Sequence, residues 1–459
     1  MEKTNLVEGK IFPTLMRFAI PFLVAYFLQQ LYGAVDLLVV GQFCTPVESS
    51  AVSTGSQVMK TITGIVTGLS TGATVLIGQY IGAKRKEDAA KTVGTAIMLF
   101  LVVAVVFTGI MLLLSRQTAI LMQAPEAALD QTDEYIFICS IGIVFIVGYN
   151  AVSGILRGMG DSKSPMIFVI VACIVNIGLD LLFVAVFDMK AAGAALATVI
   201  AQALSFLFSL VYLKVKGFGL EVKAKHIRLD RQKTGGILRF GTPVALQEAL
   251  VNISFLIITA ILNSKGLIES AAVGVVEKVI CFAMLPTTAM SMAIAAMAAQ
   301  NIGADRADRA KLCLKYGMLF TLGIAAVIVV FIEVGGGPLL LSIFTKDSQT
   351  VSVGFWYLRS YAMDIILVCF IFCMNGFFNG CGKTFFTMAH SLIATFAVRV
   401  PLAWLFSVTA GFGMFEMGLA APIASVCSIV MCFVYFKAGK WRPKFKVNLT
   451  EDDLNVATH

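Results

Sequence analysis

The sequence predicts an all-α polytopic membrane protein, with twelve transmembrane helices in two pseudo-symmetric six-helix bundles. The first observation is composition, because the 459 residues are 58% hydrophobic and 14% charged, with a mean hydropathy of +0.89. Soluble proteins carry roughly 25% charged residues, so this composition excludes a water-soluble fold. The second observation is a series of apolar segments of spanning length. The third is a sequence repeat that relates the two halves of the chain.

Twelve apolar segments are long enough to cross a bilayer, which takes about 20 helical residues. They fall at about 13–41, 52–80, 92–115, 132–156, 164–187, 191–213, 236–262, 271–299, 312–333, 350–379, 384–410 and 416–437. One long polar link lies at the middle of the chain. We therefore expect an N-lobe at 1–215, a cytoplasmic linker at 216–234, a C-lobe at 235–438 and a cytoplasmic tail at 439–459.

The second half of the chain repeats the first. Three short motifs recur in the same order at offsets of 221 or 222 residues, namely Gln79–Arg85 with Gln300–Arg306, Met16–Pro21 with Leu238–Pro243, and Arg157–Gly160 with Asn379–Gly382. Six helices separate equivalent positions, so both copies enter the membrane from the same side. The repeat is therefore parallel, and a substrate cavity is expected between the two lobes.

The distribution of basic residues indicates the orientation. Of the 35 Lys and Arg residues, 27 fall on the side that holds both termini and the central link, and four fall on the other side. Basic residues accumulate on the cytoplasmic side, so we expect a multi-pass plasma membrane protein with both termini in the cytoplasm. The net charge of +8 is then explained by topology and by contact with anionic membrane lipid, and no nucleic-acid-binding module is found.

Asp36 is the first candidate functional residue. It stands in an apolar run, with only uncharged residues between Arg17 and Glu48. An unpaired acid at membrane depth costs several kcal/mol, and intramembrane carboxylates are functional by default. The alternative is an Asp that is hydrogen-bonded to neighbouring helices for packing alone.

Three further polar residues accompany Asp36 at a similar depth. Asp36, Asp180 and Thr198 each lie seven or eight residues from the outer end of their expected helices, which places them about 10 to 12 Å below the outer surface. Asn176 lies four residues before Asp180 and shares its helix face. Carboxylates with amide and hydroxyl neighbours can bind a proton or a hard cation such as Na⁺. The alternative is that these residues face different neighbours.

Enzymatic and metal-binding motifs are weak. The ten Cys show no C-x-x-C spacing and no pairing with His, so we expect neither disulfides nor a zinc site, and no cofactor. Gly158–Asp161 matches the G-x-G-D motif of intramembrane aspartyl proteases, but it falls at a helix end and has no second acid at its depth. We expect a protein that is not an enzyme.

The chain resembles the multidrug and toxic compound extrusion (MATE) family over essentially all twelve helices. The motifs that carry the resemblance are Gln30–Asp36, Gly158–Pro165, Asn176–Asp180 and Gly193–Thr198. The resemblance implies a V-shaped pair of six-helix bundles, alternating access and cation-coupled export. It also implies a proton or Na⁺ coupling site in the N-lobe, lined in the same lobe by aromatic and amide side chains. The implied coupling residues are Asp36, Asn176, Asp180 and Thr198, and the implied lining residues are Tyr32, Tyr135 and Asn150.

The second lobe also contains intramembrane acids. Glu248, Glu277 and Asp364 match positions where one branch of the family and its eukaryotic relatives carry a cation or substrate site. Two alternatives stay open for them. Neighbouring charges could simply neutralise them, since Lys278 follows Glu277 and Arg359 precedes Asp364. Two more cations at membrane depth could either pair with the acids or contact the substrate, namely Lys60 and Arg399.

The leading functional hypothesis is a secondary active multidrug exporter. It would be monomeric and would exchange amphipathic or cationic compounds for H⁺ or Na⁺ by alternating access. The alternative is a flippase or exporter of lipid-linked saccharide or another amphiphile, but the singled-out residues are mostly carboxylates rather than the cations that a pyrophosphate needs. The first helix is the expected moving part, because Pro21 removes a backbone hydrogen bond and Gly33 adds freedom before Asp36.

Overall fold

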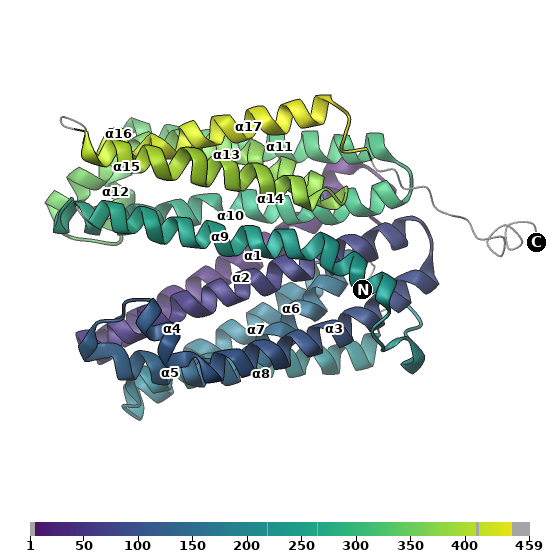
Figure 1. The fold of residues 1–459 in the computed structure, drawn as a ribbon, viewed down its shortest axis with the longest axis horizontal. Coiled ribbons are helices and arrows are strands. Elements are labelled where there is room, and N and C mark those ends of the chain that lie inside the picture. The colour runs from purple at the N-terminus through teal and green to yellow at the C-terminus, as the bar shows by residue number, and fades with distance from the viewer. Residues whose placement is uncertain (1–4, 218, 264, 410–412, 443–459) are drawn as a thin grey trace, which may run out of the picture.

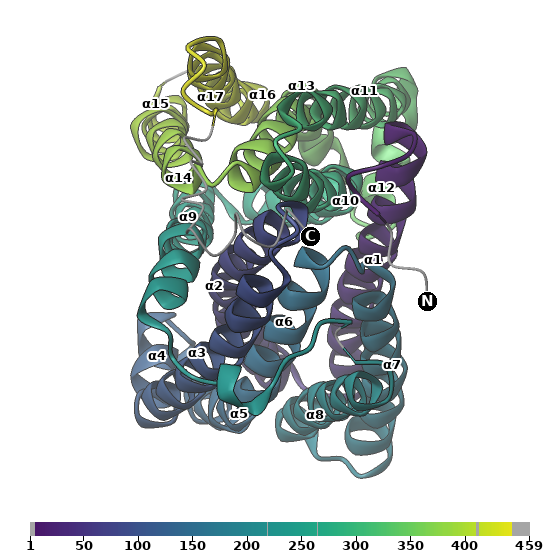
Figure 2. The ribbon, with the colours of Figure 1, turned by 90° about the vertical axis from the view of Figure 1, so that its right-hand side faces the viewer.

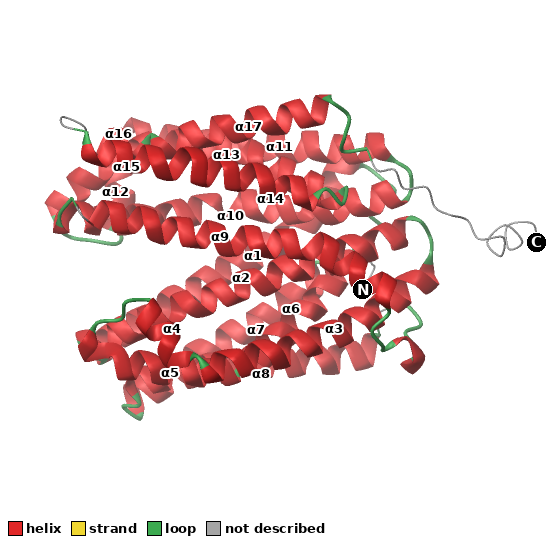
Figure 3. Cartoon of the chain, viewed as in Figure 1, coloured by secondary structure: helices red, strands yellow, loops and turns green. Residues whose placement is uncertain are grey.

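A computed structural model of the protein describes residues 5–217, 219–263, 265–409 and 413–442. The described chain consists of helices joined by short loops (Figure 3). Eleven helices are long and apolar enough to span a membrane, and a bent pair brings the number to twelve. The expected fold class of twelve transmembrane helices is therefore confirmed. The last 17 residues of the expected tail, and residue 410 of the expected eleventh helix, lie outside the described residues.

Helices α1 to α8 make up the first half of the chain. Six spans are formed by α1 (Ile11–Phe43), α2 (Pro46–Gly82), α3 (Lys86–Leu113) with α4 (Ser115–Leu121), η1 (Glu126–Ala128) and α5 (Leu129–Ile141) with α6 (Ile143–Gly158), α7 (Lys163–Asp180) with η2 (Leu181–Val186), and α8 (Lys190–Lys216). The bent pair is the fourth span, in which the helices on either side of Gly142 meet at 46°.

The second half follows the same plan after the short η3 (Ala224–His226). Its spans are α9 (Arg231–Asn263), α10 (Leu267–Gly303), α11 (Ala307–Phe331) with η4 (Ile332–Gly336) and α12 (Gly337–Ser342), α13 (Ser348–Gly380), α14 (Thr384–Leu392) with η5 (Ile393–Arg399) and α15 (Val400–Val408), and α16 (Met414–Gly418) with α17 (Ala420–Lys437). Helices α2 and α10 both have 37 residues and end on the equivalent glycines of the sequence repeat.

The two halves form the arms of a V (Figure 1). Helices α2 to α8 lie in one arm and α9 to α17 in the other, and the arms diverge away from the end where the first and last described residues lie. We call that end the terminal end and the opposite one the far end. Figure 2 looks onto the terminal end, where α2 and α10 lie near the centre and carry much of the buried surface.

The first helix of each half packs against the other half. Helix α1 contacts α10, and its residues Leu15, Phe18 and Phe22 belong to a hydrophobic cluster that includes Met290 and Phe377. Helix α9 contacts α2 in the same way. Apolar burial of this kind contributes roughly 25 cal/mol per Å² and is the main force that holds the two arms together.

Two glutamines close the terminal end. Gln79 at the end of α2 donates from Nε2 to the carbonyl of Gly380 at 3.1 Å, and Gln300 at the end of α10 donates to the carbonyl of Gly158 at 2.9 Å. Both glutamines are buried. A Cβ at Gly82 would lie 1.9 Å from the Gln300 carbonyl oxygen, so the two backbones meet closely. We call these reciprocal contacts the glutamine seal.

The segments before α1 and α9 are also tied to the opposite half. Asn301 and Arg306 donate to the carbonyls of Leu6 and Val7 at 3.0 and 2.9 Å, so the N-terminal segment is held by the second half. The segment before α9 is held by the first half, because Thr95 on α3 donates to the Arg228 carbonyl at 3.2 Å, and at the start of α9 Lys233 pairs with Asp88 at 2.6 Å. At the terminal end, each half therefore holds the segment that leads into the first helix of the other half.

Candidate functional site

Asp36 and Asp180 lie buried in the first half of the chain. Asp36 is on α1, and Asp180 is the last residue of α7, directly before the π-helical turn η2. The two helices pack against each other. One oxygen of Asp36 and both oxygens of Asp180 are buried without a hydrogen-bond partner among the described residues. Breaking a buried charge pair costs about 3–5 kcal/mol, so acids left unpaired in this way are costly to keep.

Several candidate residues that the sequence predicted in this half interact with one another in the structure. Asp36 lies close enough to Asp180 for the two carboxylates to interact electrostatically, and Tyr135 on α5 interacts with both. Tyr32 stands one turn before Asp36 and interacts with it. Asn176 is buried, and both polar atoms of its side chain lack a partner within the described chain.

The donor set fits a proton or a hard monovalent cation. Two carboxylates and an amide oxygen are ligands of the kind that Na⁺ accepts, and they are buried with free lone pairs. Thr198 is half-buried on α8, which packs against α7. In the described part of the chain, no group of three or more His, Cys, Asp or Glu side chains is arranged to hold a metal ion.

Asn150 differs from Asn176 because its side chain is satisfied. Thr67 on α2 donates to Asn150 Oδ1 at 2.9 Å, and Asn150 Nδ2 donates to the Ile146 carbonyl at 2.9 Å. Tyr135 is packed directly against Gly55 on α2. These two lining residues therefore hold α2 against the fourth span, in addition to any role toward a ligand.

The residues expected to form a hinge lie inside an unbroken helix. Helix α1 runs continuously from Ile11 to Phe43 and includes Pro21. A Cβ at Gly33 would meet nothing within 4 Å, so that position is free of packing constraints. The hinge stays a prediction.

The acids of the second half are not neutralised by the neighbours that the sequence suggested. Arg359 binds Glu333 at 2.7 Å instead of Asp364, and Lys278 lies over the ring of Phe344 at 5.9 Å. Neither cation forms a salt bridge with the acid near it in the sequence, since Arg359 is directed to Glu333 of η4 and Lys278 to the Phe344 ring. Asp364 is buried on α13, and its Oδ1 has no partner in the described chain.

Glu248 faces the first half of the chain, and Glu277 acts on charges of both halves. A Cβ at Gly64 of α2 would lie 3.9 Å from Glu248 Oε2, and Glu248 is exposed. Glu277 on α10 interacts electrostatically with both Arg399 and Lys60, which come from opposite halves. Both cations that the sequence could not place therefore act electrostatically on this acid.

Two tyrosines complete this region. Tyr357, Tyr361 and Asp364 recur at spacings of four and three residues and so share one face of α13. Arg399 Nη2 donates to the Tyr361 hydroxyl at 3.0 Å. Sequence reasoning missed the tyrosines, although this helical spacing before a buried acid could have revealed them.

The fold is that of an all-helical membrane protein built from two repeated halves. The MatE family model matches residues 21–182 and again residues 243–405, so the two matches begin 222 residues apart, as the sequence repeat requires. Together they cover more than half of the chain. The chain belongs to the MatE family, a family of membrane transporters.

Known proteins resemble the chain along nearly its whole length. It is 27% identical to the probable multidrug resistance protein YpnP of Bacillus subtilis, over 96% of this chain and 98% of the relative. It is 23% identical to the multidrug export protein MepA of Staphylococcus haemolyticus, over 97% of each chain. The outward-facing conformation of a multidrug resistance MATE family transporter of the MOP superfamily superimposes with a TM-score of 0.88, at 23% identity, over 96% of this chain and 98% of that one.

Proposed function

We propose that the protein is a secondary active multidrug exporter that exchanges amphipathic or cationic compounds for H⁺ or Na⁺ by alternating access. The observation that carries the proposal is the cluster of Asp36, Asp180 and Asn176, which are buried with free polar atoms. Relatives named for multidrug resistance and multidrug export match the chain over almost its full length and support the drug substrates.

Electrostatics supports coupling at this cluster. Two ionised carboxylates in a medium of low dielectric repel each other, so the ion-free site favours an arrangement that separates or hydrates them. A bound proton or Na⁺ removes the repulsion and favours an arrangement that brings α1 and α7 together. The ion shifts the balance only by its difference in affinity for the two states, and about 1.4 kcal/mol changes the population ratio tenfold.

The excess of basic residues supports a cytoplasmic terminal end. With 27 Lys and Arg on that side, the glutamine seal closes the cytoplasmic side and the arms diverge toward the outside. The protein then exposes its drug site outward in this structure and works as a monomer in the plasma membrane. Anionic lipid would contact the same basic side.

The acids of the second half serve substrate or cation binding in this proposal. Glu248 faces the opposite arm, Glu277 is acted on by the Lys60 charge of that arm, and Asp364 is buried on α13. A cationic drug between the arms would find its counter-charge there, and a second cation could bind in the same place. We expect Glu248→Gln and Asp364→Asn to weaken drug affinity more than they change ion dependence.

Dye efflux from membrane vesicles under separately imposed pH and Na⁺ gradients tests the proposal. We expect one gradient to drive export and Asp36→Asn to abolish it, because the amide keeps the volume but cannot change charge. The matched control is Asp130→Asn, since Asp130 is an exposed residue paired with Arg116 at 2.9 Å near the far end. Export by Asp36→Asn at the wild-type rate, or export driven by neither gradient, would refute ion coupling at this site.

A further inference from the structure

Arg399 is a half-buried cation at membrane depth that acts electrostatically on Glu277 and Asp364 but forms no salt bridge with either of them. It ends the π-helical turn η5 and lies nine residues before the far-end terminus of α15, about 14 Å into the span. Among the described residues, no carboxylate lies within 4.0 Å of its guanidinium. A charged side chain at this depth is costly, and intramembrane charges mark substrate or ion pathways.

Protein contacts fix the guanidinium but leave most of its donors free. One of its five N–H donors reaches the Tyr361 hydroxyl at 3.0 Å. The guanidinium lies over the ring of Phe255 on α9, 4.6 Å from its centre. The nitrogens of Arg399 are absent from the buried unpartnered atoms of the described chain, unlike Arg157 Nε, so its remaining donors are accessible.

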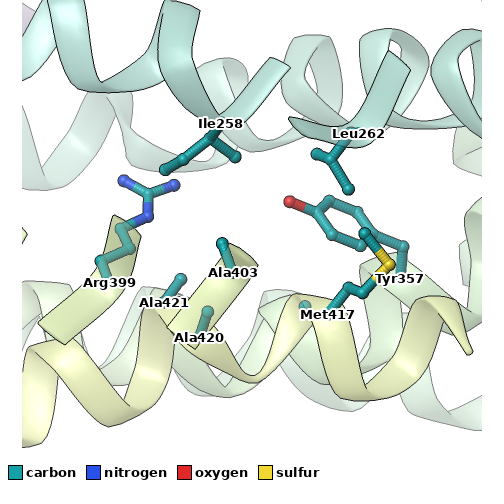
Figure 4. A pocket seen from close by; sticks show the side chains of 9 residues that line it. Ile258, Leu262, Tyr357, Arg399, Ala403, Met417, Ala420 and Ala421 are labelled. Carbon is teal, nitrogen blue, oxygen red and sulfur yellow. The ribbon is translucent and has the colours of Figure 1, made fainter. Parts of the chain in front are cut away.

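Space is present beside the guanidinium. A cavity of about 10 Å³, enough for about one water molecule, lies between α9, α13, α15 and α16, and Arg399 and Tyr357 line it. Figure 4 shows the guanidinium directed toward Ile258 and the Tyr357 hydroxyl directed into the same space. A guanidinium fixed by a tyrosine hydroxyl and an aromatic ring matches the planar, two-oxygen geometry of a carboxylate.

A second cation, in the other half of the chain, acts on the same acid as Arg399. Lys60 is exposed on α2 and, like Arg399, acts electrostatically on Glu277 of α10. Lys60 also has no carboxylate within ion-pair distance in the described chain. Lys60 of one half and Arg399 of the other therefore both act on one acid, Glu277, and neither forms a salt bridge within the described chain.

We propose that Arg399, assisted by Lys60, binds a carboxylate of the exported compound, so that the preferred substrates are aromatic zwitterions rather than simple cations. The proposal rests on the proposed export function. In it, the guanidinium binds the carboxylate, Phe255 and Tyr361 contact the aromatic part, and the amine lies toward Glu277 or Glu248. No covalent step is involved.

A pair of dyes that differ only in this group tests the proposal. The probes are a rhodamine with a free carboxylate and its methyl ester, which is a simple cation. We expect Arg399→Gln to lower vesicle export of the acid, and its affinity for the purified protein measured by fluorescence titration, about tenfold or more, as for loss of a charge-assisted hydrogen bond. The ester should change less than twofold.

Further variants separate binding from folding. Arg399→Lys keeps the charge but loses the planar fork, so the loss for the acid should be intermediate. Lys60→Gln should show a smaller loss with the same dye selectivity. Arg359→Gln is the matched control, because Arg359 lies in the same arm but is paired with Glu333 at 2.7 Å. It should leave both dyes unchanged.

The outcomes distinguish this inference from the export function. Equal losses for both dyes, or an unchanged affinity for the acid, would overturn the role of Arg399. If Arg399→Gln does not fold, the acid-to-ester affinity ratio of Arg399→Lys decides in its place. Export of neither dye by the wild type would contradict the export function instead, while the affinity ratio would still test the carboxylate site.

Discussion

Buried polar side chains in this protein are of two kinds. His390 is buried on α14 and satisfied on both ring nitrogens, with Ser428 Oγ at 2.7 Å and Asn375 Oδ1 at 2.8 Å. Asp36 and Asp180 are equally buried but keep oxygens without partners in the described chain. The first pattern contributes to packing. The second is costly and is retained where a ligand or a change of charge removes the cost.

Replacing one acid of the pair should therefore stabilise the protein while it removes coupling. We expect Asp180→Asn to raise the free energy of unfolding at alkaline pH by about 1–2 kcal/mol, because the amide removes the repulsion with Asp36 and is less costly to bury. Thermal unfolding of the purified protein in detergent measures this. A lowered melting temperature would mean that ionised Asp180 is a structural residue.

His390 should behave in the opposite way. We expect His390→Ala to destabilise the protein by about 1–3 kcal/mol, because it leaves Ser428 and Asn375 unpaired in a buried site. Dye export per folded molecule should stay at the wild-type level under either gradient. A changed pH dependence of export, with stability intact, would instead assign His390 to the proton pathway.

Among the elements, α2 and α9 are held together by backbone contact. A Cβ at Gly72 would lie 2.2 Å from the Ile237 carbonyl oxygen, and one at Gly241 would lie 2.5 Å from that of Leu69. Contacts this close leave no room for a side chain, so glycine permits the helices to cross where the linker leads into α9. The spacing of the two arms depends on these positions.

Two glycine substitutions should have opposite effects on stability. Gly72→Ala should destabilise the protein by about 1–3 kcal/mol, because the two helices must separate to admit the methyl group. Gly109→Ala is the matched control on α3, where a Cβ meets nothing within 4 Å. Helix propensity favours alanine there by up to about 1 kcal/mol. Equal melting temperatures for the two variants would contradict the close packing of α2 on α9.

The sequence predicted where the helices lie more accurately than it predicted the contacts between them. Hydropathy and the repeat predict the twelve spans and the equivalence of α2 and α10, because both can be read along the chain. They do not predict the 46° bend at Gly142 or the pairing of Arg359 with Glu333, which depend on how neighbouring spans are rotated. Asp36 and Asp180 stood out as charges in apolar runs, whereas Tyr357 and Tyr361 did not, since tyrosine is common in membrane helices.

On the scale of the whole molecule, the glutamine seal sets which end is open. Each half contributes one glutamine and accepts one hydrogen bond, so the two contacts are equivalent by the repeat. Each net hydrogen bond contributes about 1 kcal/mol. Losing both removes about 2 kcal/mol from the state in which the arms meet at the terminal end.

Removing the seal should shift the arms toward the alternative state. Spin labels at Thr45 and Lys265 report the separation of the arms at the far end. In the Gln79→Ala and Gln300→Ala double variant we expect a larger population of short distances, and each single variant should give part of that shift. Unchanged distance distributions in the double variant would show that packing of α1 and α9, rather than the glutamines, keeps the terminal end closed.

The chemistry of the seal also bears on how the protein responds to its ionic surroundings. Its contacts are amide to carbonyl and glycine to backbone, with no charged group in either. Dissolved salt screens charges over about 8 Å at physiological ionic strength but has little effect on neutral hydrogen bonds. The basic residues around the seal should respond to the salt concentration on their side of the membrane, while the seal itself should not. The free energy needed to separate the arms at the terminal end should therefore be the same at low and at high salt concentration.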